Sequence, residues 1–564
     1  MRKFLLFALF VSILAGLYLM LMQYRRIALH TAVPIPAPDQ VPLTVSESVR
    51  LPESSFAITN RIVRVPEPVL PSVKAVDVQP QTNRKVQVAV PGQIRNEHVL
   101  SFYSVIDRDK FIKESKANGA TILDVMPFGN SVRCRVDSQE TLERILKTAP
   151  TPIEQSPNLV VRYPEQERRT APVPLDDENY VGFGNRSLGW LGVSGDNSKW
   201  GSGVTIAVLD TGVAKSSTLQ EANITRRDFL DLPADAEGEG AGHATAVASI
   251  IAGNGVDVKG VSPSAGILSY RVLDGAGSGD SFTMAKALVD AVDSGARVIN
   301  ICAGSESDSH IMKGAVGYAI QKGVLIVASA GNDGSSHISY PAGYDGVISV
   351  GAVDAQGAHA NFSNTGAKLS VSAPGIGVAT GGVGDEKITF SGTSAAAPFV
   401  SGTLGALISE CPDLSPGEVA DLVRKYADDV GKPGKDEEYG YGILNISRIL
   451  NRNQNGVYDV SMADLYTVPG PADAAQVKFI AYAQNRGTEP LDELDMRVQI
   501  SEQNHQMTFR DIGVGGIAQY EFSVDRSRLG NDIREIRTKV SLPGQPDADP
   551  KDNARTFMFE KRQR

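Results

Sequence analysis

Residues 204–210 read VTIAVLD, an unbroken apolar run that ends on an aspartate. Runs of the same kind recur along the chain: ARVINICAG at 296–304, GVLIVASAGN at 323–332 and VISVGAV at 347–353. Nearly continuous apolar runs are typical of parallel strands that are buried on both faces. Amphipathic segments such as SFTMAKALVDAVDSG, at 281–295, lie between these runs. We therefore expect residues 171–452 to form a doubly wound α/β domain around a parallel sheet.

Polar side chains stand where these strands end. Asp210, Cys302 and Asn332 lie at the ends of three apolar runs, and ligands of open α/β sheets bind outside the carboxyl ends of the strands. Two helical segments add His243, in GHATAVASIIAG, and Ser394, in SGTSAAAPFVSG. Taken singly, each residue has a structural explanation, such as a turn for the aspartate or a helix N-cap for the serine. Their occurrence together indicates a catalytic site.

The order Asp210, His243, Asn332 and Ser394, with the motifs around these residues, resembles that of the subtilisin-like serine proteases. The resemblance covers residues 179–450 and includes SYPAGYDGVISVGAV, NFSNTG and SAPG. It implies a subtilisin-like fold and a serine endopeptidase in which Ser394 is the nucleophile, His243 is the general base and Asp210 orients the imidazole. The Asn332 side chain and the backbone N–H of Ser394 would then stabilise the oxyanion.

The same resemblance implies how a peptide substrate is held. Two short segments, GSG and CAG, match the edges between which the family grips an extended peptide by its backbone. Small residues near the second edge suggest an open pocket for the side chain before the cut, so we expect broad, apolar-leaning specificity. The substrate-binding residues expected on these grounds are Gly277, Ser278, Gly279, Cys302, Ala303, Gly304, Ala330 and Gly331.

The sequence departs from the family pattern without losing a catalytic group. Ala246 replaces a usual second histidine, and Cys302 stands where a serine is common. Cys302 either makes the enzyme sensitive to thiol reagents or is simply a small buried side chain. The loop AGNGVDVKGV, at 252–261, is short beside the calcium-binding loop of many relatives. We therefore expect no required cofactor and no metal ligands, and a structural calcium ion is possible but unsupported.

The composition excludes several functional classes. The 564 residues carry a net charge of −10, which argues against nucleic acid as a partner. The three cysteines, Cys134, Cys302 and Cys411, are far apart and support neither a disulfide framework nor a cysteine zinc site.

The N-terminus carries an apolar segment of membrane-spanning length. Arg2 and Lys3 precede an uncharged run over 4–22, which matches the ~20 residues needed to cross a bilayer. Two interpretations stay open: an uncleaved signal-anchor within residues 1–32, or a cleaved signal peptide, for which no convincing cleavage site is present. We expect a single-pass anchor with the catalytic domain outside the cytoplasm, periplasmic or extracellular. Because positive charge flanks the apolar segment on both sides, the charges do not predict its orientation. The orientation is inferred from the resemblance, since proteases of this family are usually exported.

Between the apolar segment and the catalytic domain the sequence predicts two further regions. Residues 33–96 are rich in proline and small polar residues and are predicted to be a disordered linker. Residues 97–170 are predicted to form a ferredoxin-like β-α-β-β-α-β unit. This unit resembles the inhibitory propeptide of the family, which implies self-cleavage between Pro164 and Leu175. The alternative is an accessory domain that is never removed.

After the catalytic domain, residues 456–564 alternate polar and apolar side chains with period two. This pattern predicts a C-terminal β-sandwich without an obvious catalytic cluster. The expected partners of the whole chain are protein or peptide substrates, its own propeptide domain and a membrane. Two rival functions stay open: an inactive protease fold that serves as a binding scaffold, and an esterase with the same triad. The peptide-gripping edges favour amide substrates.

Overall fold

A computed structural model describes residues 60–62, 90–148, 150, 152–163, 176–177, 180–193, 196–220, 223–230, 241–255, 257–468 and 475–559. All of them belong to one compact unit that begins at Ser54. The predicted anchor, residues 1–32, lies outside the described residues. Among the helices that are described, none is long and apolar enough to cross a membrane.

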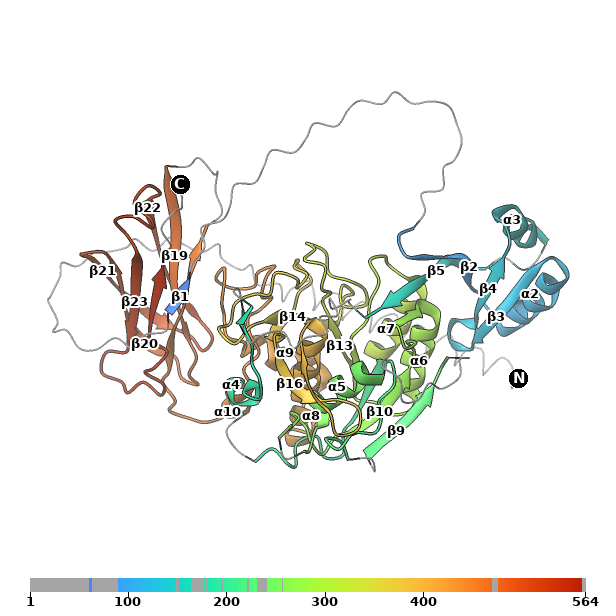
Figure 1. Ribbon diagram of the computed structural model, residues 1–564, viewed down its shortest axis with the longest axis horizontal. Helices are drawn as coiled ribbons and strands as arrows, with labels where there is room; N and C mark the ends of the chain where they lie inside the picture. The colour runs from blue at the N-terminus through green and yellow to red at the C-terminus, as the bar shows by residue number, and fades with distance from the viewer. Residues whose placement is uncertain are drawn as a thin grey trace, which may run out of the picture. The chain divides into compact units, whose positions relative to one another are not determined.

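The catalytic domain is built on a seven-stranded sheet with the order β15-β14-β13-β12-β8-β10-β9 (Figure 1). Every neighbouring pair in it is parallel, as the apolar runs predict. The strands are β8 (Thr205–Asp210), β9 (Ile224–Asp228), β10 (Gly266–Arg271), β12 (Val298–Ile301), β13 (Leu325–Ser329), β14 (Val347–Val353) and β15 (Val371–Pro374).

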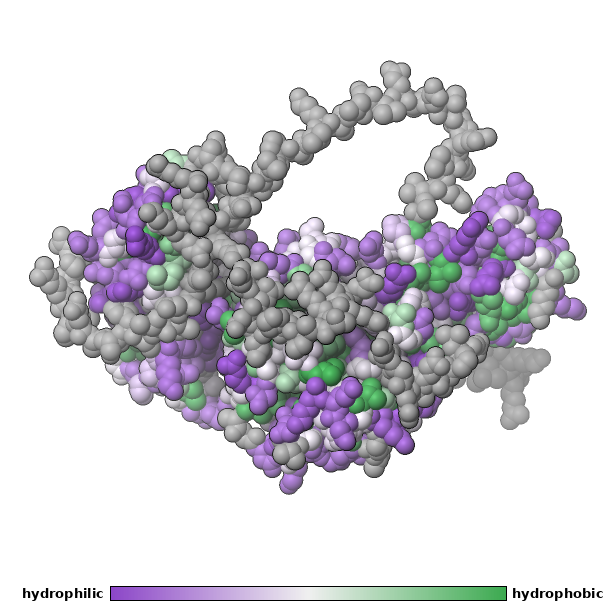
Figure 2. Space-filling model, in the orientation of Figure 1, coloured by the Kyte–Doolittle hydropathy of each residue, from purple (hydrophilic) through white to green (hydrophobic). Residues whose placement is uncertain are grey.

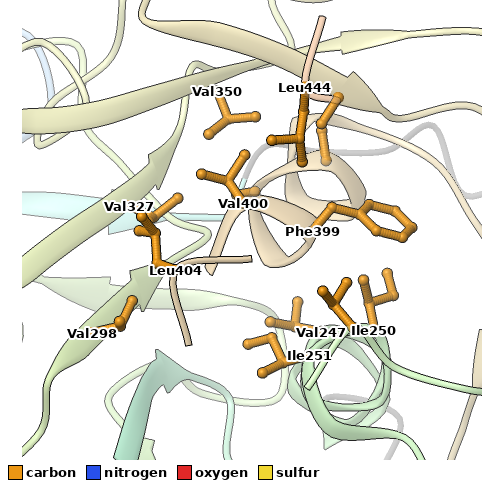
Figure 3. Close-up of a cluster of buried hydrophobic side chains, with 14 of the residues drawn as sticks. Val247, Ile250, Ile251, Val298, Val327, Val350, Phe399, Val400, Leu404 and Leu444 are labelled. Atoms are coloured by element: carbon orange, nitrogen blue, oxygen red, sulfur yellow. The ribbon is translucent and has the colours of Figure 1, made fainter. Parts of the chain in front are cut away.

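Helices cover both faces of this sheet, so it has two hydrophobic cores. Along β8, Ile206 and Val208 face one core while Ala207 and Leu209 face the other, because successive side chains of a strand point to opposite faces. The first core contains α5 (Ala241–Ala252) and α8 (Thr393–Glu410), and the second contains α6 (Ser281–Asp293) and α7 (His310–Gln321). Figure 3 shows Val247, Ile250 and Ile251 of α5 beside Phe399, Val400 and Leu404 of α8.

Small residues let α8 lie close to its neighbours. A Cβ on Gly402 would stand 2.6 Å from Val261, and one on Gly405 would stand 2.8 Å from Ile206. The remaining elements of this domain are short: α4 (Ser187–Trp190), α9 (Pro416–Lys425), α10 (Ile446–Asn451), β6 (Asp176–Asp177), β7 (Tyr180–Val181), β11 (Ser278–Asp280), β16 (Val378–Gly381) and β17 (Lys387–Phe390).

The N-terminal unit has the predicted order β-α-β-β-α-β. Its elements are β2 (Gln93–Ser101), α2 (Val105–Ala117), β3 (Ala120–Met126), the 3-10 turn η1 (Phe128–Asn130), β4 (Ser131–Val136), α3 (Gln139–Thr148) and β5 (Glu154–Arg162). It has a core of its own that includes Leu100, Phe111, Val132 and Leu142. Its sheet, with the order β5-β2-β4-β3, is extended at β5 by β11 of the catalytic domain.

The C-terminal region consists of two sheets around one core, the sandwich that period-two alternation predicts. One sheet is β18 (Val460–Thr467), β19 (Gln476–Asn485) and β22 (Ile517–Asp525). The other is β20 (Leu491–Ile500), β21 (Gln503–Ile512), β23 (Glu535–Ser541), β24 (Ala554–Met558) and a strand that the sequence did not predict, β1 (Asn60–Ile62). Hydrophilic residues predominate on the molecular face in Figure 2, as expected when period-two strands bury alternate side chains.

Candidate active site

The four residues expected to be catalytic lie at the carboxyl edge of the parallel sheet or on helices that begin there. Asp210 ends β8 and Asn332 follows β13. His243 and Ser394 lie in the first turns of α5 and α8. Because the strands are parallel, their carboxyl ends share one edge, which brings together residues far apart in the sequence.

Asp210 and His243 form the best-defined contact of the site. Both carboxylate oxygens of Asp210 lie 2.9 Å from His243 Nδ1. Asp210 is fully buried and also accepts a hydrogen bond from the backbone N–H of Thr211 at 2.6 Å. A buried carboxylate requires donors, so the imidazole proton is placed on Nδ1. The lone pair on Nε2 is then free to accept a proton.

The Ser394 hydroxyl is hydrogen-bonded to a backbone carbonyl. Its Oγ donates to the carbonyl of Cys302 at 3.4 Å, and among the described contacts no hydrogen bond joins it to His243. The imidazole instead stacks on Tyr163, with ring centroids 4.5 Å apart, and meets Phe390 edge-on. The rings of Tyr163 and Phe390 therefore pack against two sides of the imidazole.

Asn332 is oriented by the residue that precedes Ser394. Its Oδ1 accepts from the backbone N–H of Thr393 at 2.9 Å and from the Thr393 hydroxyl at 2.8 Å. With the oxygen committed, Nδ2 is the free end of the amide. The first-turn N–H groups of α8 lack intrahelical acceptors, so Nδ2 and the Ser394 N–H are both available as oxyanion donors.

The cleft already contains a strand of the same chain. Arg162 N–H donates to the Gly304 carbonyl at 3.0 Å, and Gly304 N–H donates to the Arg162 carbonyl at 2.8 Å. Tyr163 N–H donates to the Gly277 carbonyl at 3.1 Å. On the other side β5 pairs antiparallel with β11, where Ser278 lies opposite Arg162. The segment thus lies between the two edges expected to grip a peptide.

Comparison with known proteins agrees with this geometry. Residues 201–442 match the model of the Subtilase family. The chain is 31% identical over 355 residues to a thermophilic serine proteinase from Bacillus sp. (strain AK1), covering 62% of this chain and 86% of that protein. It is 38% identical over 248 residues to subtilisin Savinase from Lederbergia lenta, covering 43% and 90%. The chain belongs to the subtilase family. It is a serine endopeptidase.

A solved structure extends the likeness of fold beyond the catalytic domain. It is fervidolysin from Fervidobacterium pennivorans, described as a keratinolytic enzyme related to subtilisin. The likeness covers 83% of this chain and 76% of that one, with a TM-score of 0.53 and 21% sequence identity.

The structure divides the expected substrate-binding residues of this subtilase into three groups. Gly277, Ser278, Gly279 and Gly304 pair with the bound segment. Gly277 has a φ of +75°, and a Cβ there would stand 1.8 Å from the Tyr163 ring, so only glycine leaves room for it. The second group, Cys302, Ala303 and Ala330, is buried and does not pair with the segment. Gly331 forms the third group, because it lines a hollow.

This hollow has a volume of about 350 Å³ and adjoins the bound segment. Gly304, Ser329 and Gly331 form part of its wall, as do the carboxylates of Glu306 and Asp333. Both acidic residues are exposed. Neither residue is predictable from the sequence, because two carboxylates in separate loops carry no pattern that points to one pocket.

For Cys302 the structure supports the buried alternative. Its side chain is fully buried, and its thiol donates to the Ser394 carbonyl at 3.6 Å. Burial, reinforced by the charge of Asp210, raises the pKa of this thiol far above its ordinary value. Because the thiolate is the reactive form, we expect Cys302 to react slowly with thiol reagents.

No group of three or more His, Cys, Asp or Glu side chains placed to hold a metal ion occurs in the described part of the chain. Calcium binding therefore has no support from the described residues, and the loop in question is closed by a backbone bridge between Asn254 and Lys259.

Proposed function

We propose that Asp210, His243, Ser394 and Asn332 carry the peptide hydrolysis of this subtilase. The observation that carries the proposal is the contact of both Asp210 oxygens with His243 Nδ1, which leaves Nε2 as a base beside the Ser394 helix. His243 removes the hydroxyl proton as Ser394 Oγ attacks the substrate carbonyl. Asp210 holds the imidazole and stabilises its charged form.

The developing oxyanion would be met by Asn332 Nδ2 and the Ser394 N–H. The protonated imidazole then gives its proton to the leaving amine, and an acyl-enzyme remains on Ser394. Water, deprotonated by the same histidine, attacks the acyl group and regenerates the enzyme.

We also propose that the enzyme is made as a zymogen and cuts itself between Pro164 and Leu175. The support is the strand 158–163, which lies in the cleft as an extended peptide and stacks Tyr163 on the catalytic imidazole. Residues 97–170 would thereby inhibit the enzyme until they are displaced. The alternative of a permanent accessory domain predicts that no cut occurs.

Export and membrane attachment complete the proposal and rest on the sequence alone. The apolar run within 1–32 is long enough to cross a bilayer, and it precedes both the inhibitor-like unit and the enzyme. The backbone pairing at both edges of the cleft favours peptides over simple esters, and the intact set of Asp210, His243, Asn332 and Ser394 argues against an inactive binding scaffold.

Labelling with a fluorophosphonate probe tests the site, after the inhibitor-like unit has been displaced. Ser394→Ala is expected to abolish labelling and peptide hydrolysis while leaving the fold intact. Asn332→Ala is expected to stay labelled and to lose a factor of roughly 10² to 10³ in kcat, the magnitude known for this donor in subtilisin. A folded wild-type enzyme without labelling, or full activity in Ser394→Ala, would contradict the assignment.

Sequencing of the N-terminus tests the self-cleavage. Wild type is expected to show a new N-terminus between Pro164 and Leu175, and Ser394→Ala is expected to keep the original one. The same uncut chain in both preparations would favour the permanent accessory domain.

A further inference from the structure

The N-terminal arm, by which we mean residues 1–62, is joined to the C-terminal sandwich by the strand β1. β1 pairs in parallel with β24, and Asn60, Arg61 and Ile62 lie opposite Thr556, Phe557 and Met558. Figure 1 shows β1, in blue, among the red strands of the sandwich. The two partners are separated in sequence by the inhibitor-like unit and by the whole catalytic domain.

The edge that β1 covers is one that a folded protein would not leave bare. β24 pairs with β23 on its other side, so without β1 its outer backbone N–H and C=O groups would be unpaired. Such an edge is a template for pairing with other chains. Phe557 of β24 is fully buried and Thr556 nearly so, which ties the strand firmly to the core.

The opposite edge of the same sheet shows the contrast. There β21 reads QNHQMTFRDI, and most of its residues are exposed. A polar, charged edge strand is a usual protection against unwanted pairing. β24 reads ARTFM and has fewer polar side chains. We therefore infer that β1 is what protects its edge from pairing with other chains.

The arm sequence suits this role. Between Pro52 and Pro66 no proline or glycine interrupts the chain, and residues 58–65 read ITNRIVRV. β-branched residues are enriched in strands, and a run without proline can donate its N–H groups to a neighbour.

We propose that β1 is a docking strand, and that the β24 edge of the sandwich retains the N-terminal arm on the enzyme after self-cleavage. The inference rests on the proposed cut between Pro164 and Leu175, which would otherwise sever residues 1–62 from the catalytic domain. The N-terminal product then contacts the enzyme at two places: the inhibitor-like unit at the cleft and β1 at β24.

Two linked contacts bind more tightly than either alone, because the second forms within the complex. Degradation of the inhibitor-like unit removes the first contact and leaves β1 in place. The sandwich thus gives the arm, with its apolar segment, an attachment that does not depend on inhibition. Addition of a strand to a sheet edge is a recognised mode of peptide binding.

The test uses the full-length Ser394→Ala chain with an engineered site for a sequence-specific protease between Pro66 and Gln87 and an affinity tag at the C-terminus. After the engineered cut, only β1 pairing joins the arm to the enzyme. We expect the arm to co-elute with the tag in detergent, and N60P/R61P to lower its recovery at least tenfold. Adjacent residues of a strand alternate in the direction of their N–H groups, so the double change removes one that faces β24. N60A/R61A is the matched control and should retain the arm.

A disulfide cross-link would detect the pairing of β1 with β24 even if the arm binds the sandwich weakly. Asn60→Cys with Thr556→Cys places cysteines at opposed positions, where Cα atoms of paired strands are close enough for a disulfide. Asn60→Cys with Arg555→Cys is the out-of-register control. Equal recovery of the arm with and without N60P/R61P, or equal cross-linking in both cysteine pairs, would overturn the proposal. Since Ser394 is replaced by alanine and the cut is engineered, these results do not depend on self-cleavage. A failure of self-cleavage would appear separately, as an uncut wild-type chain in the N-terminal sequencing.

Discussion

The Thr393 hydroxyl is one of two groups that orient the Asn332 amide. Thr393 Oγ1 and the Thr393 backbone N–H both donate to Asn332 Oδ1, which leaves Nδ2 as the free end of the amide. We expect Thr393→Val, which keeps the shape and the backbone N–H, to lower kcat roughly fivefold with little change in KM, since one hydrogen bond is worth about 1 kcal/mol. Thr393→Ser keeps the hydroxyl and should approach wild-type kcat. A wild-type kcat in Thr393→Val would show that the amide is oriented by something else.

The two carboxylates of the hollow bear on specificity. Glu306 and Asp333 line the space that adjoins Gly304 and Gly331, so a lysine or arginine before the cut would find opposite charge there. This qualifies the apolar-leaning specificity that small residues suggested. E306Q/D333N is expected to lower kcat/KM for basic peptides about three- to tenfold relative to leucine peptides, because exposed ion pairs contribute about 0.2–1 kcal/mol each. Paired assays at low and high salt would check it, and an unchanged ratio would exclude a role for these carboxylates.

At the scale of single residues, the sequence predicted which groups lie at the carboxyl edge of the sheet but not which contacts they make. Asp210, His243, Asn332 and Ser394 were predicted because strand ends and helix starts carry chemistry with recognisable neighbours. The hydrogen bond from Ser394 to Cys302 and the stacking of Tyr163 on His243 join residues that lie more than 70 positions apart in the sequence. No local pattern encodes such a contact.

Among the elements, the N-terminus of α6 is where the inhibitor-like unit is held. Asn158 is fully buried, and its Oδ1 accepts from Ser281 Oγ and Phe282 N–H at the start of α6. Its Nδ2 donates to Glu97 and to Asp280, the N-cap of that helix. Arg133 bridges the same two carboxylates. These hydrogen bonds and ion pairs therefore satisfy buried polar groups of both the inhibitor-like unit and the catalytic domain.

Removal of the amide should loosen this contact. Asn158→Leu has a similar size but takes one donor from Glu97 and Asp280, which keep only Arg133 in common, and removes the acceptor of Ser281 Oγ. Unsatisfied buried groups cost about 1–3 kcal/mol each. We expect the N-terminal fragment to leave the cleft at least tenfold faster, measured as the rise of peptide hydrolysis after the zymogen is purified. Asn118→Leu makes the same change at the end of α2, away from α6, and should leave this rate unchanged. If both variants behave alike, the contact at α6 does not set the release.

Elements with a strong burial pattern were predictable, and short polar ones were not. β8, β12, β13 and β14 are buried on both faces and so appear as continuous apolar runs. β9 reads ITRRD and is largely exposed, and β1 has three residues, so neither carries a period that distinguishes it from a loop. Their pairing depends on an edge supplied by a remote part of the chain.

For the whole molecule, buried charges link the sandwich to the catalytic domain. Arg486, after β19, lies 3.5 Å from Asp428 and 3.2 Å from Asp552. Arg448 of α10 reaches Asp428 at 2.9 Å. Burial alone would raise the pKa of Asp428, but the two arginines outweigh it and hold the pKa below its usual value. This carboxylate is therefore charged at neutral pH and ties both arginines to one point.

The neighbouring Asp429 behaves in the opposite way. Burial, together with the charges of Asp436 and Asp464, raises its pKa to about 7 despite a hydrogen bond from Gly434 N–H and the nearby Arg486. Its backbone N–H donates to Gln484 of β19, which places Asp429 at the junction between the two domains.

The sign of the resulting pH dependence follows from linkage. Between about pH 4, near the unfolded pKa, and about pH 7 the folded state binds the Asp429 proton more tightly than the unfolded state does. The free energy of unfolding should therefore fall as the pH rises through this window and level off above it. Asp429→Asn removes the titration, so its stability relative to wild type should increase from pH 5 to pH 8. Thermal unfolding of both chains in the Ser394→Ala background, which prevents self-digestion, measures this. Asp421→Asn, on the exposed face of α9, is the control, and its stability should depend on pH as that of the wild type does. If the stabilities of Asp429→Asn and wild type instead run parallel from pH 5 to pH 8, the Asp429 carboxylate is ionised throughout this range and the prediction is wrong.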